Sequence, residues 1–134
     1  MTIVQPPGWP RPAGYANAVT AKGRLVSVSG QIGWNPVSET FETDEMAAQV
    51  RQALDNLAVI LRAAGADPRH VVRLTWYVTD RAEYIAARRE IGEAYRALFL
   101  DHYPAMSVIV VAGLLDRRAK VEIEGTAVVP DEES

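Results

Sequence analysis

The sequence predicts an α+β domain in which two helices pack on one face of a sheet. Two segments carry apolar residues at spacings of three and four, as amphipathic helices do. The other apolar segments are short and rich in Val and Ile, as strands are. Their order is β-β-α-β-α-β-β, which in 134 residues corresponds to a single two-layer domain, residues 1–134.

The first 32 residues are predicted to be extended. Residues 1–14 hold four of the eight prolines and are therefore expected to form an extended arm. Trp9 in this arm is expected to be sheltered, either by anchoring the arm or by lining a pocket or a subunit contact. Residues 15–32 resemble two strands with a turn at Lys22–Gly23.

The two helices are predicted over residues 44–64 and 81–100. Gly65 is suited to end the first, and Asp80 and Glu83 have capping-box spacing at the start of the second. Between them, Val71–Val78 alternates as a half-buried strand does. The inward residues are expected to be Met46, Val50, Ala53, Leu54, Leu57, Ile60 and Leu61 in the first helix, and Tyr84, Ile91, Ala94, Tyr95, Leu98 and Phe99 in the second.

The last two strands are predicted over Met106–Leu114 and Ala119–Val129, before a frayed tail at 130–134. The first of these strands is apolar on both faces. Two helices can cover only one face of the sheet, so we expect another subunit to cover the other. The sequence therefore predicts an obligate homo-oligomer.

Composition argues against several classes of function. The net charge of −3 and the absence of a basic stripe argue against nucleic acid as a partner. The N-terminus does not resemble a signal peptide, and no apolar run reaches the ~20 residues that span a bilayer. There is no cysteine, and neither strong metal-ligand spacing nor a phosphate-binding loop appears, so these motifs nominate no metal site and no phosphate-binding site. A cytoplasmic protein fits these features.

Three features are candidates for a site, each with a structural alternative. Glu122 and Glu124 point to one face of the last strand, either into solvent or to an interface where a desolvated carboxylate could act as acid or base. Ser29–Gly33 is either a strand-to-loop turn or a place where backbone N–H groups meet a ligand. His102 is expected to be a surface loop residue, with a pocket mouth as the alternative.

Several stretches, in order, resemble the RidA/YjgF family, also called the endoribonuclease L-PSP family. They are "GYANAV", "VSGQIG", "AAQVRQALDNLAVILRAAGAD", "VVRLTWYVTD", "EAYRALF", "YPAMSVIVVAGL" and "KVEIEGTAVV", and they cover most of the chain from Gly14 to Val129. The resemblance implies a chorismate-mutase-like fold with a mixed sheet. It also implies a homotrimer with small-molecule sites in clefts between subunits. Active members hydrolyse enamine or imine intermediates to 2-keto acids and ammonia without a cofactor.

The resemblance also implies site residues. Tyr15 matches the family's cleft tyrosine, Gly30 its backbone-contact glycine, and Glu122 the glutamate that positions water. Met106, followed by Ser107, stands where active members have the arginine that binds the substrate's carboxylate. Losing a charge-assisted contact costs about 1.5–3 kcal/mol, so standard 2-aminoacrylate deaminase activity is expected to be weak or absent. Other arginines are available as substitutes: Arg11, Arg73, Arg88 and Arg117.

Three hypotheses for the function follow. The first is a divergent imine or enamine deaminase in which Glu122 handles water. The second is a non-catalytic trimer that binds a small molecule as a sensor or partner protein. The third is RNA cleavage or translation inhibition, a label attached to the family, and the acidic charge argues against it.

Overall fold

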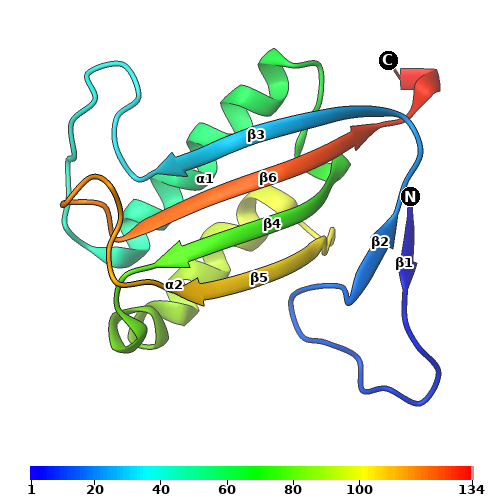
Figure 1. Ribbon diagram of the computed structural model, residues 1–134, viewed down its shortest axis with the longest axis horizontal. Coiled ribbons are helices and arrows are strands. Elements are labelled where there is room, and N and C mark those ends of the chain that lie inside the picture. The colour runs from blue at the N-terminus through cyan, green and yellow to red at the C-terminus, as the bar shows by residue number, and fades with distance from the viewer. Residues whose placement is uncertain (134) are drawn as a thin grey trace.

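The computed structural model describes residues 1–133 and has the two predicted layers (Figure 1). Four strands form the main sheet in the order β3-β6-β4-β5, and both helices cover the same face of it. The β4–β5 pair is parallel, whereas β6 is antiparallel to both of its neighbours, so the sheet is mixed. The predicted fold class is confirmed. The elements are β3 Arg24–Ile32, α1 Met46–Ala63, β4 Val71–Val78, α2 Arg81–Phe99, β5 Ala105–Val110 and β6 Val121–Val129.

The ends of the helices follow from local hydrogen bonds. After α1, the N–H of Ala66 donates to Leu61 O at 2.8 Å, and Gly65 takes a φ of +79°. This is the C-terminal motif that favours glycine. At the start of α2, Asp80 Oδ1 accepts from the N–H of Glu83 at 2.8 Å. Only this half of the predicted capping box forms, because the Glu83 carboxylate pairs with Lys120 Nζ at 2.7 Å.

The core lies between the sheet and the helices. Along β6 the odd-numbered residues are buried against the helices, and the even-numbered ones lie on the open face. In β4 the helix-facing residues are Leu74, Trp76 and Val78. This alternation puts Glu122 and Glu124 on the open face together, as predicted from the strand period.

The N-terminal arm differs from expectation. β1 (Thr2–Val4) pairs with β2 (Ala18–Thr20) in a separate two-stranded sheet beside the main one (Figure 1). The strands on either side of the Lys22–Gly23 turn are therefore not paired with each other, because β3 pairs with β6 instead. Trp9 was expected to be sheltered, but 63% of it is exposed in the single chain.

β5 ends at Val110 instead of Leu114. Its partner β4 ends at Val78, the residue paired with Val110, so the chain beyond has no neighbouring strand to pair with. Residues 111–120 form a loop, hereafter the 111–120 loop, and β6 begins only at Val121.

The sequence had suggested that the open face of the sheet is apolar. In the structure only part of that face is apolar. Its centre carries polar side chains from β4 and β6, including Thr75, Tyr77 and Glu124. The exposed apolar residues of this sheet lie mainly on the edge strand β5, where Val108, Ile109 and Val110 are each at least 40% exposed. An exposed apolar edge strand favours burial against another chain. The homo-oligomer stays a prediction.

The chain ends in a single turn of 3-10 helix over Asp131–Glu133. The predicted frayed tail also includes Ser134, which lies outside the described residues. Within the described part of the chain, no helix combines the length and the apolar character needed to span a bilayer.

Candidate functional site

Glu122 lies in a pocket at the end of β3, which we call the Glu122 pocket. It has a volume of about 430 Å³ and is lined by Gly30, Gln31, Ile32, Trp34, Leu115, Asp116 and Glu122. Glu122 stands on β6 directly opposite Ile32. The register of β3 shifts between Val28 and Gln31, and such bulges re-aim side chains. Two residues singled out by sequence, Gly30 and Glu122, are therefore brought together.

Gly30 is required by its contact with Glu122. A Cβ built on Gly30 would overlap the Glu122 carboxylate and lie only 2.7 Å from its Cδ. Any larger residue at position 30 would therefore displace the carboxylate. Gly33, in contrast, serves packing, since a Cβ there would lie 2.5 Å from the carbonyl oxygen of Gln49 in α1. The strand does end in this stretch, at Ile32, whereas the meeting of its backbone N–H groups with a ligand stays a prediction.

The two carboxylates of β6 differ in their surroundings. Glu124 Oε1 accepts a hydrogen bond from the Tyr77 hydroxyl at 2.8 Å, and this bond raises the pKa of Tyr77. Glu122 makes no hydrogen bond or ion pair to the protein within residues 1–133. Its acceptor capacity is therefore available to a water molecule or a ligand.

Residues outside the Glu122 pocket support its wall through ring contacts and an ion pair. The ring of Trp34 contacts that of Phe41 at 6.0 Å between centroids, and the Arg118 guanidinium lies 5.4 Å from the Phe41 ring centre. Arg118 also pairs with Asp44 at 2.9 Å. Leu115 at the pocket is fully exposed in the single chain. These contacts fix the 111–120 loop beside Glu122.

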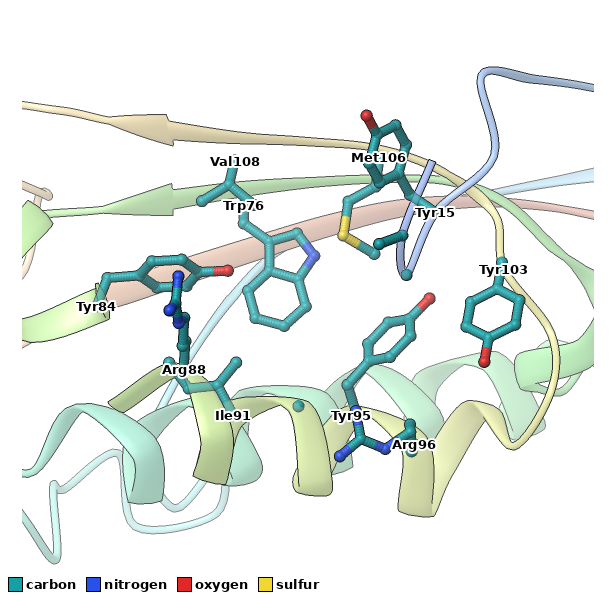
Figure 2. A pocket seen from close by; sticks show the side chains of 13 residues that line it. Tyr15, Trp76, Tyr84, Arg88, Ile91, Tyr95, Arg96, Tyr103, Met106 and Val108 are labelled. Atoms are coloured by element: carbon teal, nitrogen blue, oxygen red, sulfur yellow. The ribbon is translucent and has the colours of Figure 1, made fainter. Parts of the chain in front are cut away.

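Tyr15 and Met106 meet in a second pocket, between β5 and α2, which we call the aromatic pocket (Figure 2). Its volume is about 340 Å³. Met106 faces the helices because it pairs with the buried Leu74. The N–H of Ala16 donates to Pro104 O at 3.0 Å, which places Tyr15 beside the start of β5. The lining residues are Ala13, Gly14, Tyr15, Trp76, Tyr84, Arg88, Ile91, Gly92, Tyr95, Arg96, Tyr103, Met106 and Val108.

Ser107 lies in neither pocket. The strand alternation turns it to the open face, where its hydroxyl accepts from Arg73 Nη2 at 3.3 Å. The five site residues proposed from sequence therefore fall into three places in one chain. Only Gly30 with Glu122, and Tyr15 with Met106, are brought together.

The structure adds residues to the aromatic pocket that the sequence reasoning had not assigned to a site. Trp76 and Tyr95 had been interpreted only as core, and Arg96 had not been considered. Of the four arginines considered as substitutes, Arg88 lines this pocket. The signal available in the sequence was the spacing of Tyr84, Arg88, Ile91 and Tyr95, which repeats by three and four along one helix face.

His102 was expected to be a surface residue, but its imidazole is partly buried. Nε2 lies 2.6 Å from the carbonyl oxygen of Val71, to which it donates. His102 thus ties the turn after α2 to the start of β4. Within residues 1–133, no three His, Asp or Glu side chains lie together as a metal site would require.

The fold and the two pockets together define the class of protein. It is an α+β protein whose mixed sheet is covered by helices on one face, with the Glu122 carboxylate on the open face and the aromatic pocket at the sheet edge. Over residues 10–129 the sequence matches the model of the endoribonuclease L-PSP family. The chain therefore belongs to this family, the RidA/YjgF family that the sequence resembled.

Named relatives agree with this membership. A human protein named 2-iminobutanoate/2-iminopropanoate deaminase is 33% identical over 114 residues, covering 85% of this chain and 79% of the relative. The Escherichia coli K12 protein of the same name is 37% identical over 109 residues, covering 79% and 80%. A Yersinia pestis Rid-family structure of unknown function has 32% identity and a TM-score of 0.84, covering 96% of this chain and 98% of that one.

Proposed function

We propose that this protein hydrolyses the imine or enamine form of a small metabolite, with Glu122 as the residue that handles water. Imine deaminase activity is the function that named relatives in the family support. The observation that carries the proposal for this chain is the contact of Gly30 with Glu122. The carboxylate for which Gly30 makes room has no protein partner within residues 1–133, and it lines a pocket large enough for a small substrate.

The chemistry requires one base and no redox step. Glu122 takes a proton from water as the water oxygen attacks the carbon of the C=N bond, and it passes that proton to the imine nitrogen. The carbinolamine then transfers its hydroxyl proton to the nitrogen, and the C–N bond breaks as C=O forms and ammonia leaves. The sum is imine plus water giving ketone plus ammonia. General-base assistance of this kind contributes about 10²- to 10⁴-fold in rate.

We further propose that the complete site forms between subunits of a homotrimer, in a cytoplasmic protein. In one chain, Tyr15 and Met106 line one pocket and Glu122 another, so two copies are needed to join the residues that the family resemblance brings together. The exposed apolar residues support the interface, since Leu115 lies at the Glu122 pocket and Ile109 on the edge strand. Light scattering after size exclusion should give three times the 14.7 kDa chain mass. A stable monomer would contradict the shared cleft.

Substitution of Glu122 tests the catalytic role. An L-amino-acid oxidase can generate a panel of imino acids in place, and semicarbazide trapping then measures how fast each is hydrolysed. Glu122→Gln keeps the shape of the side chain but removes the base, so the rate should fall at least about tenfold while binding persists. Glu124→Gln is the matched control on the same face, and its rate should change much less because Glu124 is engaged with Tyr77.

Activity on the smallest substrates is expected to be low. Met106 supplies no cation for the carboxylate of 2-aminoacrylate, which a PLP-dependent dehydratase can generate. If both glutamate variants hydrolyse the panel at the wild-type rate while the oligomer stays intact, Glu122 is structural. If the wild type hydrolyses no imino acid, the alternative hypothesis of a non-catalytic binding trimer replaces the enzyme.

A further inference from the structure

Two of the residues that line the aromatic pocket each carry a buried polar atom with no hydrogen-bond partner within residues 1–133. They are Trp76 Nε1 and Tyr95 Oη, and among residues 1–133 neither finds a donor or an acceptor. Only 2% of Trp76 and 6% of Tyr95 are exposed. In Figure 2 the indole nitrogen and the hydroxyl both lie toward the side of the pocket where Met106 stands. Leaving such groups unsatisfied costs stability, so they call for an explanation.

The Trp76 indole N–H and the Tyr95 hydroxyl both require a hydrogen-bond acceptor. An indole N–H can only donate, and a tyrosine hydroxyl donates readily. The two rings are held together, with 6.1 Å between their centroids, and Tyr95 stacks on Phe99 at 4.6 Å. Two fixed donors in one pocket favour an oxygen acceptor.

The remaining lining is largely apolar. Ile91, Met106 and Val108 contribute aliphatic and thioether surface, and tyrosine rings close the sides. A dry cavity of about 150 Å³ is enough to hold benzene. The aromatic pocket, at about 340 Å³, therefore has room for a phenyl-sized body together with a short polar head.

Two arginines of α2, Arg88 and Arg96, line the aromatic pocket. Arg88 and Arg96 make no ion pair within residues 1–133, whereas the neighbouring Arg89 lies 3.6 Å from Glu93. The Arg96 guanidinium folds back over Gly92, where a Cβ would lie 3.0 Å from Nη1. Glycine inside a helix costs stability, and here it makes room for that guanidinium. Gly92 is about one turn from Arg88, so both cations act on the same side of the pocket.

We propose that the aromatic pocket binds a small carboxylate with an apolar, phenyl-sized body. A carboxylate oxygen accepts hydrogen bonds from Trp76 Nε1 and Tyr95 Oη, and Arg88 and Arg96 supply the balancing positive charge. Hydrogen bonds to an ionised acceptor are the stronger kind, so such a ligand accounts for two buried donors that have no protein partner within residues 1–133. If the protein has the proposed hydrolase function, on which this step rests, its preferred substrates are imino acids with a large apolar side chain.

Direct binding tests the proposal without turnover. The probe is 3-phenylpropanoate, compared with its neutral counterpart 3-phenylpropan-1-ol and with propanoate, which lacks the apolar body. The protein has three tryptophans, so its NMR spectrum should show three indole N–H signals, and Trp76→Phe identifies that of Trp76. We expect 3-phenylpropanoate to move this signal downfield and to bind at least about tenfold more tightly than either comparison compound. Equal binding of the alcohol, or an unmoved Trp76 signal, would overturn the proposal.

Two further variants separate binding from folding. Tyr95→Phe removes the unpaired hydroxyl, so the melting temperature should stay the same or rise while affinity for 3-phenylpropanoate falls about tenfold or more. Arg88→Gln should also weaken binding. Arg89→Gln is its matched control, with the same loss of charge one residue away from the pocket, and should leave affinity unchanged. Normal binding by Tyr95→Phe, or equal losses for the two arginine variants, would refute the assignment.

These outcomes are distinct from those of the activity assay. If small imino acids are hydrolysed through Glu122 but 3-phenylpropanoate does not bind, this inference fails and the proposed function stands. If 3-phenylpropanoate binds as expected but no imino acid is hydrolysed, the pocket assignment stands. The proposed function then fails, and so does the inferred preference for imino acids with a large apolar side chain.

Discussion

Gln49 offers a demanding test of how the Glu122 pocket is held. This side chain is fully buried in α1 and makes three hydrogen bonds to backbone groups. Its amide nitrogen donates to the carbonyls of Thr43 at 3.1 Å and Arg118 at 3.0 Å, and its oxygen accepts from the N–H of Lys120 at 2.8 Å. One glutamine thus fastens the end of the 111–120 loop to the helix.

Gln49→Met keeps the length of the side chain and removes all three bonds. Each net hydrogen bond contributes about 0.5–1.5 kcal/mol, so the loss of three should lower the unfolding free energy by about 1.5–4.5 kcal/mol. For a chain of this size that corresponds to a melting temperature about 6–18 °C lower. Thermal unfolding followed by circular dichroism at equal protein concentration measures it, since an oligomer melts in a concentration-dependent way.

The control for this variant is Gln52→Met, on the same helix. Among residues 1–133, Gln52 bonds only the side chain of Asn56, at 2.8 Å, so its loss should cost less than about 1.5 kcal/mol. Because the loop leads directly into the strand that carries Glu122, Gln49→Met should also slow imine hydrolysis at temperatures where it is folded. A melting temperature within about 2 °C of wild type would refute the reasoning, since the three bonds would then contribute nothing.

Two other predictions concern packing and pH. Gly33→Ala should destabilise the protein, because the new Cβ would lie 2.5 Å from the backbone oxygen of Gln49 and neither backbone can move freely; urea unfolding measures the loss. Burial raises the pKa of Tyr84 and Tyr95, and the bond to Glu124 raises that of Tyr77. A tyrosine whose folded pKa is raised stabilises the fold below its unfolded pKa of about 10 and loses that contribution as pH rises further. Unfolding free energy should therefore fall above about pH 10, less steeply in Tyr95→Phe, and a pH-independent value would contradict the burial argument.

The elements of the main sheet and both helices were predictable because their signals are local. The apolar stripe of α1 and the alternation of Val71–Val78 are set by the periods of helix and strand, and the structure has both nearly where expected. Strand ends were less predictable. Val110 ends β5 only because its neighbour β4 stops at Val78, a fact of pairing that the sequence of β5 does not contain.

The sequence also could not predict that the proposed site residues lie in separate places. Met106 and Ser107 are adjacent in the chain, yet the pleat sends one to α2 and the other to Arg73 on the open face. Alternation was readable from the sequence, but which face the helices would cover at the edge strand depended on the register with Leu74. The family resemblance named the residues, and the structure decided which of them share a pocket.

By itself, the sequence determined the α+β class, the two helices, the shared face of Glu122 and Glu124, and membership in the family, because periodicity and motif order are properties of the chain. Only the tertiary structure decided that Gly30 makes room for the Glu122 carboxylate, and that Trp76 and Tyr95 bury two donors for which the described residues supply no partner. The physical reason is that a close contact or an unmet hydrogen bond depends on what another segment brings to that point in space. No local pattern records that distance.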